Sequence, residues 1–325
     1  MNGKRRWIGV TMQTVSEPAS RILSEVERAV VGKRGLLEML MAAALSGGHV
    51  LFEDFPGLGK TLIARSFATA LGLAFRRIQF TPDLLPGDIT GGFVLNREKN
   101  DFELRQGPIF ANVLLADEIN RASPKTQSAL LEAMQEGQVT LEGETMRLPE
   151  PFLVLATQNP IEYEGTFPLP EAQLDRFMLK LTVGYPSLEE EREILHRRRE
   201  RRQDEVLLSA VIERQQLLDM RLAVEAVHVE ADLERYIAAL IHATRDDRRV
   251  SVGASPRGGL AFMKLARANA ALEGRDYVIP DDIKRYAVPV LSHRLILQPD
   301  YWMSQSVGAE VIRDVLAKTP VPVLS

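Results

Sequence analysis

Five short apolar, β-prone runs lie in the first part of the chain, and segments with helical spacing of apolar residues separate them. The runs cover residues 49–53, 74–80, 112–117, 152–157 and 177–183. Nearly continuous apolar strands that alternate with helices are typical of a mostly parallel sheet covered by helices on both faces. The pattern therefore predicts an α/β fold for this part of the chain.

Two further segments interrupt this alternation. Residues 91–107 contain two β-prone runs around a polar turn, and residues 138–148 repeat that design around Glu142-Gly143-Glu144. Short strands joined by a polar, glycine-bearing turn indicate β-hairpins. We predict that both segments form hairpins.

The composition changes after Pro186, and the rest of the chain shows one helical pattern after another. Ser187 and Glu190 form a capping-box pattern, and Pro280 is placed to open a later helix. We predict a loose tail over residues 1–17, an α/β core over 18–186, and a helical linker, lid and C-terminal extension over 187–325. Helical spacing also predicts helices within residues 21–45, with an interruption at 31–34.

The composition excludes several classes of protein. The 325 residues carry a formal net charge of -4 and no cysteine, which rules out disulfides, thiolate metal sites and cysteine nucleophiles. The longest apolar run, residues 39–45, is far shorter than the roughly 20 residues of a membrane span. We expect a cytoplasmic protein with no membrane span. The five histidines lack ligand spacing, which disfavours a histidine metal site.

A basic run at residues 196–202 raises the alternative of a nucleic-acid contact. Three glutamates at 189–191 precede it, so acids start the predicted helix and bases end it. This distribution suits the helix dipole and pairs such as Glu193 with Arg197, and no aromatic residue is interleaved for base stacking. We interpret the run as one end of a solvated helix.

The strongest chemical motif is Phe-Pro-Gly-Leu-Gly-Lys-Thr at residues 55–61, between a predicted strand and a predicted helix. Glycines in such a turn let backbone amides face phosphate oxygens, Lys60 supplies a cation for the β- and γ-phosphates, and Thr61 offers a hydroxyl to Mg²⁺. An ordinary glycine turn is the alternative, which the Lys-Thr pair disfavours. We predict nucleotide binding by Pro56, Gly57, Leu58, Gly59, Lys60, Thr61 and Leu62.

Asp54 stands where the full phosphate-loop pattern has its first glycine. We expect it to adopt the positive φ that glycine permits, at a cost of about 1 kcal/mol, with some repulsion of the nucleotide. That would weaken binding about tenfold or less. It would not abolish binding.

An acid pair follows the third apolar run. Asp117 and Glu118 come directly after four buried-strand residues, about 55 residues beyond the phosphate loop. Carboxylates at the carboxyl edge of a parallel sheet suit Mg²⁺ support by the first and water activation by the second.

Three other polar residues are candidates, each with a structural alternative. Asn159 ends the fourth run and can reach an attacking water or the γ-phosphate, or it can be an ordinary turn residue before proline. Arg176 precedes the last run and can be offered to the phosphate of a neighbouring subunit, or it can pair with a nearby acid. Arg257 lies in the first turn of a helix capped by Ser255, where a positive charge is unfavourable without an anion partner. A surface role for Arg257 is the alternative.

These motifs, taken together, resemble those of the MoxR family of AAA+ ATPases, in the helix-2-insert clade. The likeness rests on 53–61, 114–140, 156–177 and 253–262, and it runs from about Arg21 to beyond Leu291. It implies a P-loop core with a five-stranded parallel sheet of order 5-1-4-3-2, followed by a helical lid. It also implies that hairpin 91–107 is the helix-2 insertion and that hairpin 138–148 is the pre-sensor hairpin.

The resemblance also implies roles for single residues. By position Lys60, Thr61 and Asp117 bind nucleotide and Mg²⁺, and Glu118 is the catalytic base. Asn159 is similar to sensor 1, Arg176 to the arginine finger and Arg257 to sensor 2, while Val31 and Gly32 match the stretch that touches adenine. Gln79 is expected to couple the pocket to substrate. Asp54 departs from the glycine that the family usually has.

The function that the resemblance implies is Mg²⁺-dependent binding and hydrolysis of ATP to ADP, in chaperone-like remodelling or maturation of protein complexes. It implies a homo-oligomeric, hexameric ring with a protein client and a partner with a von Willebrand factor A domain. One alternative is a nucleotide-gated scaffold with little turnover. Another is a nucleic-acid or chelatase-type motor. The mixed charge of the hairpin tip at residues 96–101 disfavours the nucleic-acid motor.

Overall fold

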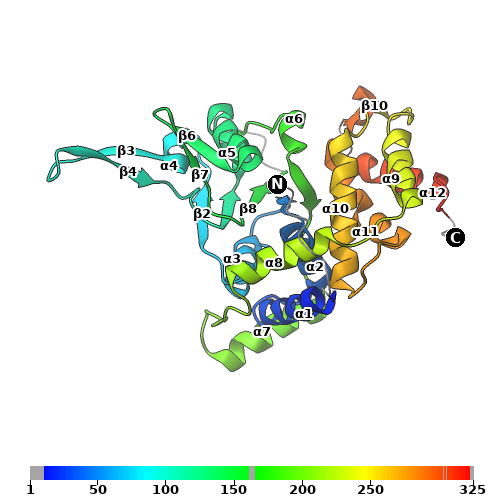
Figure 1. Ribbon diagram of the computed structural model, residues 1–325, viewed down its shortest axis with the longest axis horizontal. Helices are drawn as coiled ribbons and strands as arrows, with labels where there is room; N and C mark the ends of the chain where they lie inside the picture. The colour runs from blue at the N-terminus through cyan, green and yellow to red at the C-terminus, as the bar shows by residue number, and fades with distance from the viewer. Residues whose placement is uncertain (1–10, 161–164, 303, 305, 323–325) are drawn as a thin grey trace, which may run out of the picture. The chain divides into compact units, whose positions relative to one another are not determined.

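The computed structural model describes residues 11–160, 165–302, 304 and 306–322. The chain divides into two compact units (Figure 1). The sheet unit consists of Ile22–Glu38 and Gly47–Arg214, and the helical unit of the described residues within Met1–Arg21, Met39–Ser46 and Gln215–Ser325. The domain boundary predicted at residue 186 stays a prediction.

A five-stranded parallel sheet forms the centre of the sheet unit, in the order β2-β5-β8-β1-β9. Counting these strands along the chain gives 2-3-4-1-5, so the predicted order 5-1-4-3-2 is confirmed. Their bounds are β1 His49–Glu53, β2 Phe75–Gln79, β5 Val113–Asp117, β8 Leu153–Gln158 and β9 Phe177–Leu181.

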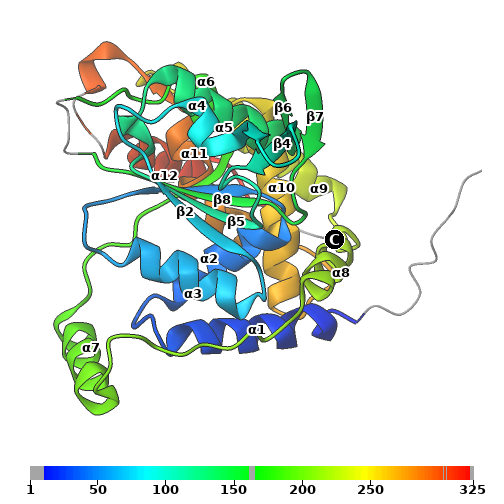
Figure 2. The same ribbon diagram turned by 90° about the vertical axis from the view of Figure 1, so that its left-hand side faces the viewer.

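The central strands β1, β5 and β8 are buried on both faces, which explains why they read as continuous apolar runs. In β5, the alternate residues Leu114 and Ala116 belong to a core that includes Leu130 and Leu131 of α5 (Pro124–Glu136). Val113 and Leu115 point to the opposite face and are equally buried. Figure 2 shows α5 on one side of the sheet and α3 (Lys60–Ala70) on the other.

Two antiparallel hairpins extend from this core, as predicted. One pairs β3 (Gly91–Asn96) with β4 (Asp101–Gln106), and the other pairs β6 (Gln138–Leu141) with β7 (Glu144–Arg147). Short α4 (Pro86–Thr90) precedes the first hairpin, which projects well away from the sheet in Figure 1.

The N-terminal helix starts earlier than expected. α1 spans Gln13–Glu27, so the predicted loose tail is wrong for residues 13–17, while residues 1–10 lie outside the described residues. Met12, Val15, Ala19 and Ile22 recur at helical spacing, and all are buried. Their burial stabilises the first turns even though Pro18 removes one donor of the helical ladder.

Helix α7 (Leu188–Arg201) continues from the sheet and carries the basic run. Ser187 and Glu190 make the predicted capping box, Glu193 pairs with Arg197, and none of the residues of α7 is buried. The interpretation as a solvated helix is confirmed. α2 spans Arg34–Leu45, η1 Ile119–Arg121 and α6 Glu171–Leu174.

The helical unit is built mainly from α8 (Arg214–Glu225), α9 (Ala231–Ala243), α10 (Pro256–Leu272), α11 (Pro280–Leu291) and α12 (Val307–Lys318). It also contains a short antiparallel ladder of β10 (Val250–Val252) and β11 (Ile296–Leu297), which the sequence pattern did not predict, and the turns η2 (Ser292–Arg294) and η3 (Pro299–Tyr301).

A buried carboxylate ties α10 to α11 within this unit. Asp282, 2% exposed, accepts hydrogen bonds from Arg275, from Asn269 and from the Ile279 amide. These donors compensate the desolvation of the carboxylate. In the described part of the chain, no helix has the length and apolarity that crossing a membrane requires.

Candidate active site

A cleft of about 460 Å³ lies at the carboxyl edge of the sheet, where polar side chains follow β1, β5 and β8. Its lining consists of Pro56, Gly57, Gly59, Lys60, Thr61, Leu62, Arg77, Gln79, Asp117, Glu118, Thr157, Gln158 and Asn159. The crevice outside the carboxyl ends of parallel strands is where open α/β sheets bind ligands. We call this cavity the phosphate cleft.

The loop between β1 and α3 has the conformation of an anion cradle. Gly57 and Gly59 have φ of 83° and 80°, which residues with a Cβ rarely adopt, and open space lies where a Cβ would stand. Gly59 is the N-cap of α3 and provides no side chain to cap the first amides of the helix. The positive end of the helix dipole and these amides face an incoming anion.

Lys60 lies in the first turn of α3 and folds back over the loop. Its Nζ donates to the carbonyl oxygens of Asp54, at 2.7 Å, and of Phe55, at 2.8 Å. Burial lowers the pKa of Lys60, and the carboxylates of Asp54, Asp117 and Glu118 partly oppose that shift. The ammonium group is therefore surrounded by oxygen atoms that a phosphate can replace.

The expected positive φ of Asp54 is wrong. The non-glycine residues with positive φ in the described chain are Asn100, Glu118, Glu142 and Arg202. Asp54 instead continues the ladder of β1, because its amide donates to the carbonyl oxygen of Gln158 at 3.2 Å. The residue is 4% exposed, and its carboxylate accepts hydrogen bonds from the backbone amides of Phe55 and Gly184.

Asp117 ends β5 with both carboxylate oxygens engaged. Oδ1 accepts a hydrogen bond from Oγ1 of Thr157 at 2.5 Å, and Oδ2 accepts from Nη2 and Nε of Arg77 at 2.7 and 3.1 Å. Thr157 lies on β8, and Arg77 lies on β2 on the other side of β5. Both neighbouring strands therefore orient this carboxylate.

Glu118 is held in a left-handed backbone conformation, with φ 56° and ψ 49°. Its amide donates to Oγ1 of Thr157 at 2.8 Å, and its Oε2 accepts from Nε2 of Gln79 at 2.7 Å and from Nη1 of Arg121 at 3.0 Å. Non-glycine residues in this region cost about 1–3 kcal/mol and concentrate at functional sites. Here the strain turns the glutamate toward the cleft.

Sequence reasoning missed three lining residues, Arg77, Thr157 and Gln158. Gln158 Oε1 is buried and has no hydrogen-bond partner in the described part of the chain. The position of Arg77 could have been predicted. Arg77 lies two residues before Gln79, so both side chains are on the same face of β2. β2 pairs with β5, the strand that carries the acid pair. Asn159, as predicted, lies in the cleft and is buried.

Other predicted site residues lie elsewhere. Arg176, between α6 and β9, is absent from the described lining of the cleft and forms no ion pair with a residue of the described chain. Val31 and Gly32 lie between α1 and α2, where Glu190 packs against Gly32. Arg257 lies in the first turn of α10 in the helical unit, behind the predicted Ser255 cap and Pro256.

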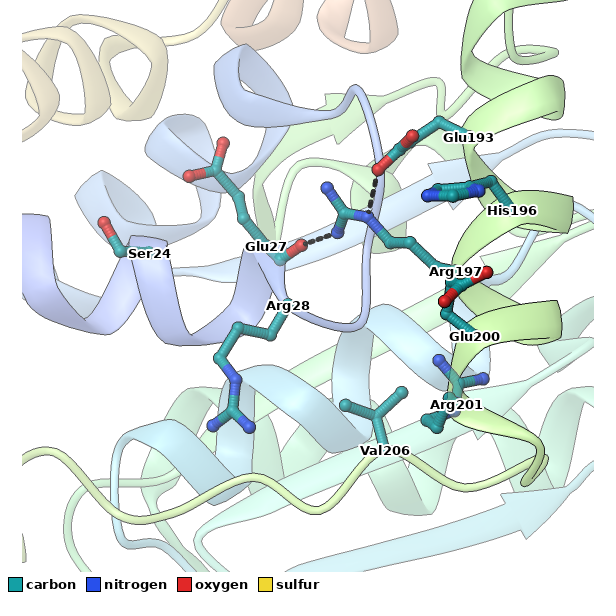
Figure 3. Close-up of a pocket in the computed structure, with 9 residues that line it drawn as sticks. All are labelled: Ser24, Glu27, Arg28, Glu193, His196, Arg197, Glu200, Arg201 and Val206. Carbon is teal, nitrogen blue, oxygen red and sulfur yellow. Dashed lines mark hydrogen bonds and ion pairs between the residues drawn. The ribbon is translucent and has the colours of Figure 1, made fainter.

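A second cavity, of about 740 Å³, lies between α1 and α7 and is lined by Ser24, Glu27, Arg28, Glu193, His196, Arg197, Glu200, Arg201 and Val206 (Figure 3). We call it the charged cleft. Arg197 crosses it, donating to Glu193 at 2.7 Å and to the carbonyl oxygen of Glu27 at 2.7 Å. Its acids and bases neutralise one another, and none of its described lining residues belongs to a phosphate-loop or acid-pair motif.

Comparison with protein families agrees with the fold and the cleft. Residues 49–179 match the family described as "ATPase family associated with various cellular activities (AAA)", and residues 242–315 match the AAA lid domain. The first match covers the strands of the parallel sheet up to β9, and the second covers most of the helical unit. The class defined by the sheet, the glycine loop and the helical part is therefore that of the AAA+ ATPases.

Individual relatives narrow this class. Chaperone MoxR1 of Mycobacterium tuberculosis is 44% identical, covering 93% of this chain and 82% of its own. Protein MoxR of Methylorubrum extorquens is 31% identical, covering 94% and 96%. A candidate ATPase of Cytophaga hutchinsonii, known from a crystal structure, superposes with a TM-score of 0.90 at 40% identity, covering 96% and 97%. The chain belongs to the MoxR family of AAA+ ATPases.

Proposed function

We propose that this protein binds ATP with Mg²⁺, hydrolyses it to ADP, and uses the cycle to remodel or mature protein complexes. The observation that carries the proposal is the convergence of the phosphate loop and the acid pair on one cleft, with Glu118 held in a strained conformation by three neighbours. A structural turn would need neither the strain nor the convergence.

The cleft suits a nucleotide with a divalent cation. Thr61 and Asp117 offer hydroxyl and carboxylate oxygens, the ligands that Mg²⁺ prefers, and the buried Gln158 Oε1 provides a further acceptor. We assign Thr61 and Asp117 as ligands of Mg²⁺. We assign residues 56–62, together with Val31 and Gly32, to nucleotide binding. Mg²⁺ in such sites neutralises charge on the β- and γ-phosphate oxygens.

Four polar side chains of the cleft then have parts in hydrolysis. Glu118 orients a water molecule and accepts its proton, and Asn159 positions the water or the γ-phosphate. Lys60 leaves the carbonyl oxygens of Asp54 and Phe55 to bind the β- and γ-phosphates. Nε2 of Gln79 donates a hydrogen bond to Oε2 of Glu118 at 2.7 Å. A movement of β2 therefore changes the orientation of the Glu118 carboxylate, the proposed base.

Arg176 is assigned to the cleft of a neighbouring subunit. Its absence from the described lining of its own cleft, and from ion pairs in the described chain, supports a role as an arginine finger in trans. A homo-oligomeric ring, of six subunits by family resemblance, provides that neighbour. Arg257 is assigned to the sensor 2 role on the same resemblance.

Mixing two inactive variants tests the assignment. Glu118→Gln subunits keep Arg176, and Arg176→Ala subunits keep Glu118, so some mixed interfaces join both intact groups. We expect ATPase activity to reappear on mixing and to be absent from either variant alone. A double variant that carries both changes, mixed with either single variant, serves as control. Mixed rings that assemble and stay inactive would refute action in trans.

The client is a protein complex, and a partner with a von Willebrand factor A domain is expected from the family. One relative, 44% identical, is named a chaperone, which supports this role. We propose a cytoplasmic location. Pull-down with the ATP-trapped Glu118→Gln variant tests the client assignment, because a trapped ring should retain its client while the nucleotide-free protein should not.

A further inference from the structure

Asp54 is a buried acid beside the phosphate loop that the proposed mechanism does not use. Its carboxylate accepts hydrogen bonds from two backbone amides: Oδ1 accepts from the amide of Phe55, in the loop, at 2.8 Å, and Oδ2 accepts from the amide of Gly184 at 2.7 Å. Gly184 lies beyond β9, 130 residues further along the chain. One carboxylate therefore bridges the start of the phosphate loop and the segment that follows β9.

The turn that donates this Gly184 amide is itself held by several contacts. Lys33 Nζ donates to the carbonyl oxygens of Gly184, at 3.3 Å, and Tyr185, at 3.2 Å. The ring of Tyr185 lies 6.1 Å from the ring of Phe55, centroid to centroid. Gly184 has φ 68°, a conformation that favours glycine. The backbone conformation of the Gly184–Tyr185 turn is therefore fixed by its own contacts.

The bonds connect two parts of the expected nucleotide site. Lys33 follows Gly32, which is assigned to the adenine end, and Asp54 opens the loop assigned to the phosphates. Lys33 and Asp54 bind the same turn, Gly184–Tyr185. Lys33 donates to the two carbonyl oxygens of the turn, and Asp54 accepts from the amide of Gly184. The distance between the two ends of the site is thus set by contacts outside the phosphate cleft.

We propose that Asp54 is a positioning residue that fastens the phosphate loop to the Gly184–Tyr185 turn and so preorganises the loop for nucleotide. The inference rests on the proposed function. A loop that is already held in its binding shape loses less conformational freedom when ligand arrives, so affinity rises without a direct contact. This assignment reverses the expectation drawn from the glycine pattern: glycine at position 54 should weaken binding.

The test compares Asp54→Asn and Asp54→Gly with the unmodified protein, using isothermal titration calorimetry with ATP or ADP in excess Mg²⁺. The asparagine keeps one acceptor but presents an NH₂ group to the other amide. The glycine keeps neither acceptor and adds backbone freedom. We expect affinity for ATP to fall about threefold for asparagine and about tenfold or more for glycine, since charge-assisted bonds are lost. Affinities in the opposite order would overturn the proposal.

Glu53→Gln is the matched control. Glu53 precedes Asp54 and also links β1 to β9, through an ion pair with Lys180 at 2.7 Å, but it does not bind the phosphate loop. Its variant should bind ATP within about twofold of the unmodified protein. If Glu53→Gln weakens ATP binding as much as Asp54→Gly does, the link between strands, and not the fastening of the loop, is responsible, and the proposal fails.

Kinetics and amide exchange separate positioning from general destabilisation. The Asp54 variants should raise KM while changing kcat by less than about twofold, because Glu118 is untouched and the ordering cost falls on binding. Hydrogen exchange of the nucleotide-free protein should rise together in residues 54–61 and 182–187. A lowered melting temperature with unchanged KM, or exchange that rises near Asp54 but not at Gly184, would refute the bridge.

The two proposals can fail separately. An unmodified protein that retains neither ATP nor ADP would refute the proposed function. The exchange experiment requires no nucleotide and would then decide by itself whether Asp54 couples the loop to the turn.

Discussion

The phosphate cleft and the charged cleft are both lined by polar side chains of the sheet unit, but the two sets of side chains are arranged differently. In the larger, charged cleft acids and bases pair with one another, as Arg197 does with Glu193 one turn earlier on α7 (Figure 3). The smaller phosphate cleft gathers amides, a lysine and two acids from strands far apart in the chain. Size and charge content alone therefore do not identify a site; convergent groups on strained backbone do.

The largest contrast between the two clefts should come from replacing one glutamate in each. We expect Glu118→Gln to lower kcat for ATP hydrolysis at least about a hundredfold, since a general base typically contributes that much. Glu193→Gln, in the charged cleft, should leave kcat within about twofold. Steady-state phosphate release measures both. Equal losses of kcat in the two variants would show that the two clefts do not differ in their part in hydrolysis.

Removal of one cation from each cleft should give the next largest contrast. Lys60→Ala should weaken ATP binding about tenfold to a hundredfold, because a charge-assisted bond to phosphate contributes about 1.5–3 kcal/mol. Arg197→Ala should leave the Kd for ATP unchanged, since Arg197 binds Glu193 and the Glu27 carbonyl oxygen. Calorimetric titration gives both constants. Tight binding by Lys60→Ala would place the phosphates elsewhere.

A smaller effect is expected from replacing Arg77 in the phosphate cleft. Arg77 holds Oδ2 of Asp117 at 2.7 Å, so it would compete with Mg²⁺ for that oxygen in the proposed site. Because a partly exposed ion pair contributes about 0–1 kcal/mol, Arg77→Met should lower the Mg²⁺ concentration for half-maximal ATP binding about threefold. Arg76→Met, on the other face of β2, is the control. An unchanged or higher midpoint would contradict competition at Asp117.

The smallest effect should come from the charged cleft itself. Arg197→Met removes an ion pair at the solvated surface and one bond to α1, so the midpoint of thermal unfolding should fall by no more than about 2 °C. Differential scanning calorimetry with and without ATP measures it. A large loss of stability, or a loss that ATP reverses, would mean that the charged cleft supports the nucleotide site.

The sequence by itself determined the strands of the parallel sheet, the phosphate loop and the position of the acid pair. These features are local or periodic: apolar runs mark buried strands, glycines and Lys60-Thr61 mark the loop, and Asp117 with Glu118 follows a strand directly. The carboxyl ends of parallel strands share one edge, so strand assignment alone brought the loop, the acid pair and Asn159 to one cleft.

Only the tertiary structure decided the conformations and hydrogen-bond partners of the residues around the loop and the acid pair. The backbone of Asp54 could not be inferred from the glycine pattern, because a hydrogen bond to Gly184, 130 residues away, fixes its side chain. The same holds for Arg77 beside Asp117 and Thr157 beneath Glu118, which depend on strand order and register. Helix α1 begins at Gln13 because Met12 and Val15 find buried positions. Non-local partners set conformations that local propensity leaves open, since burial and hydrogen bonds to distant residues outweigh the small differences among local backbone states.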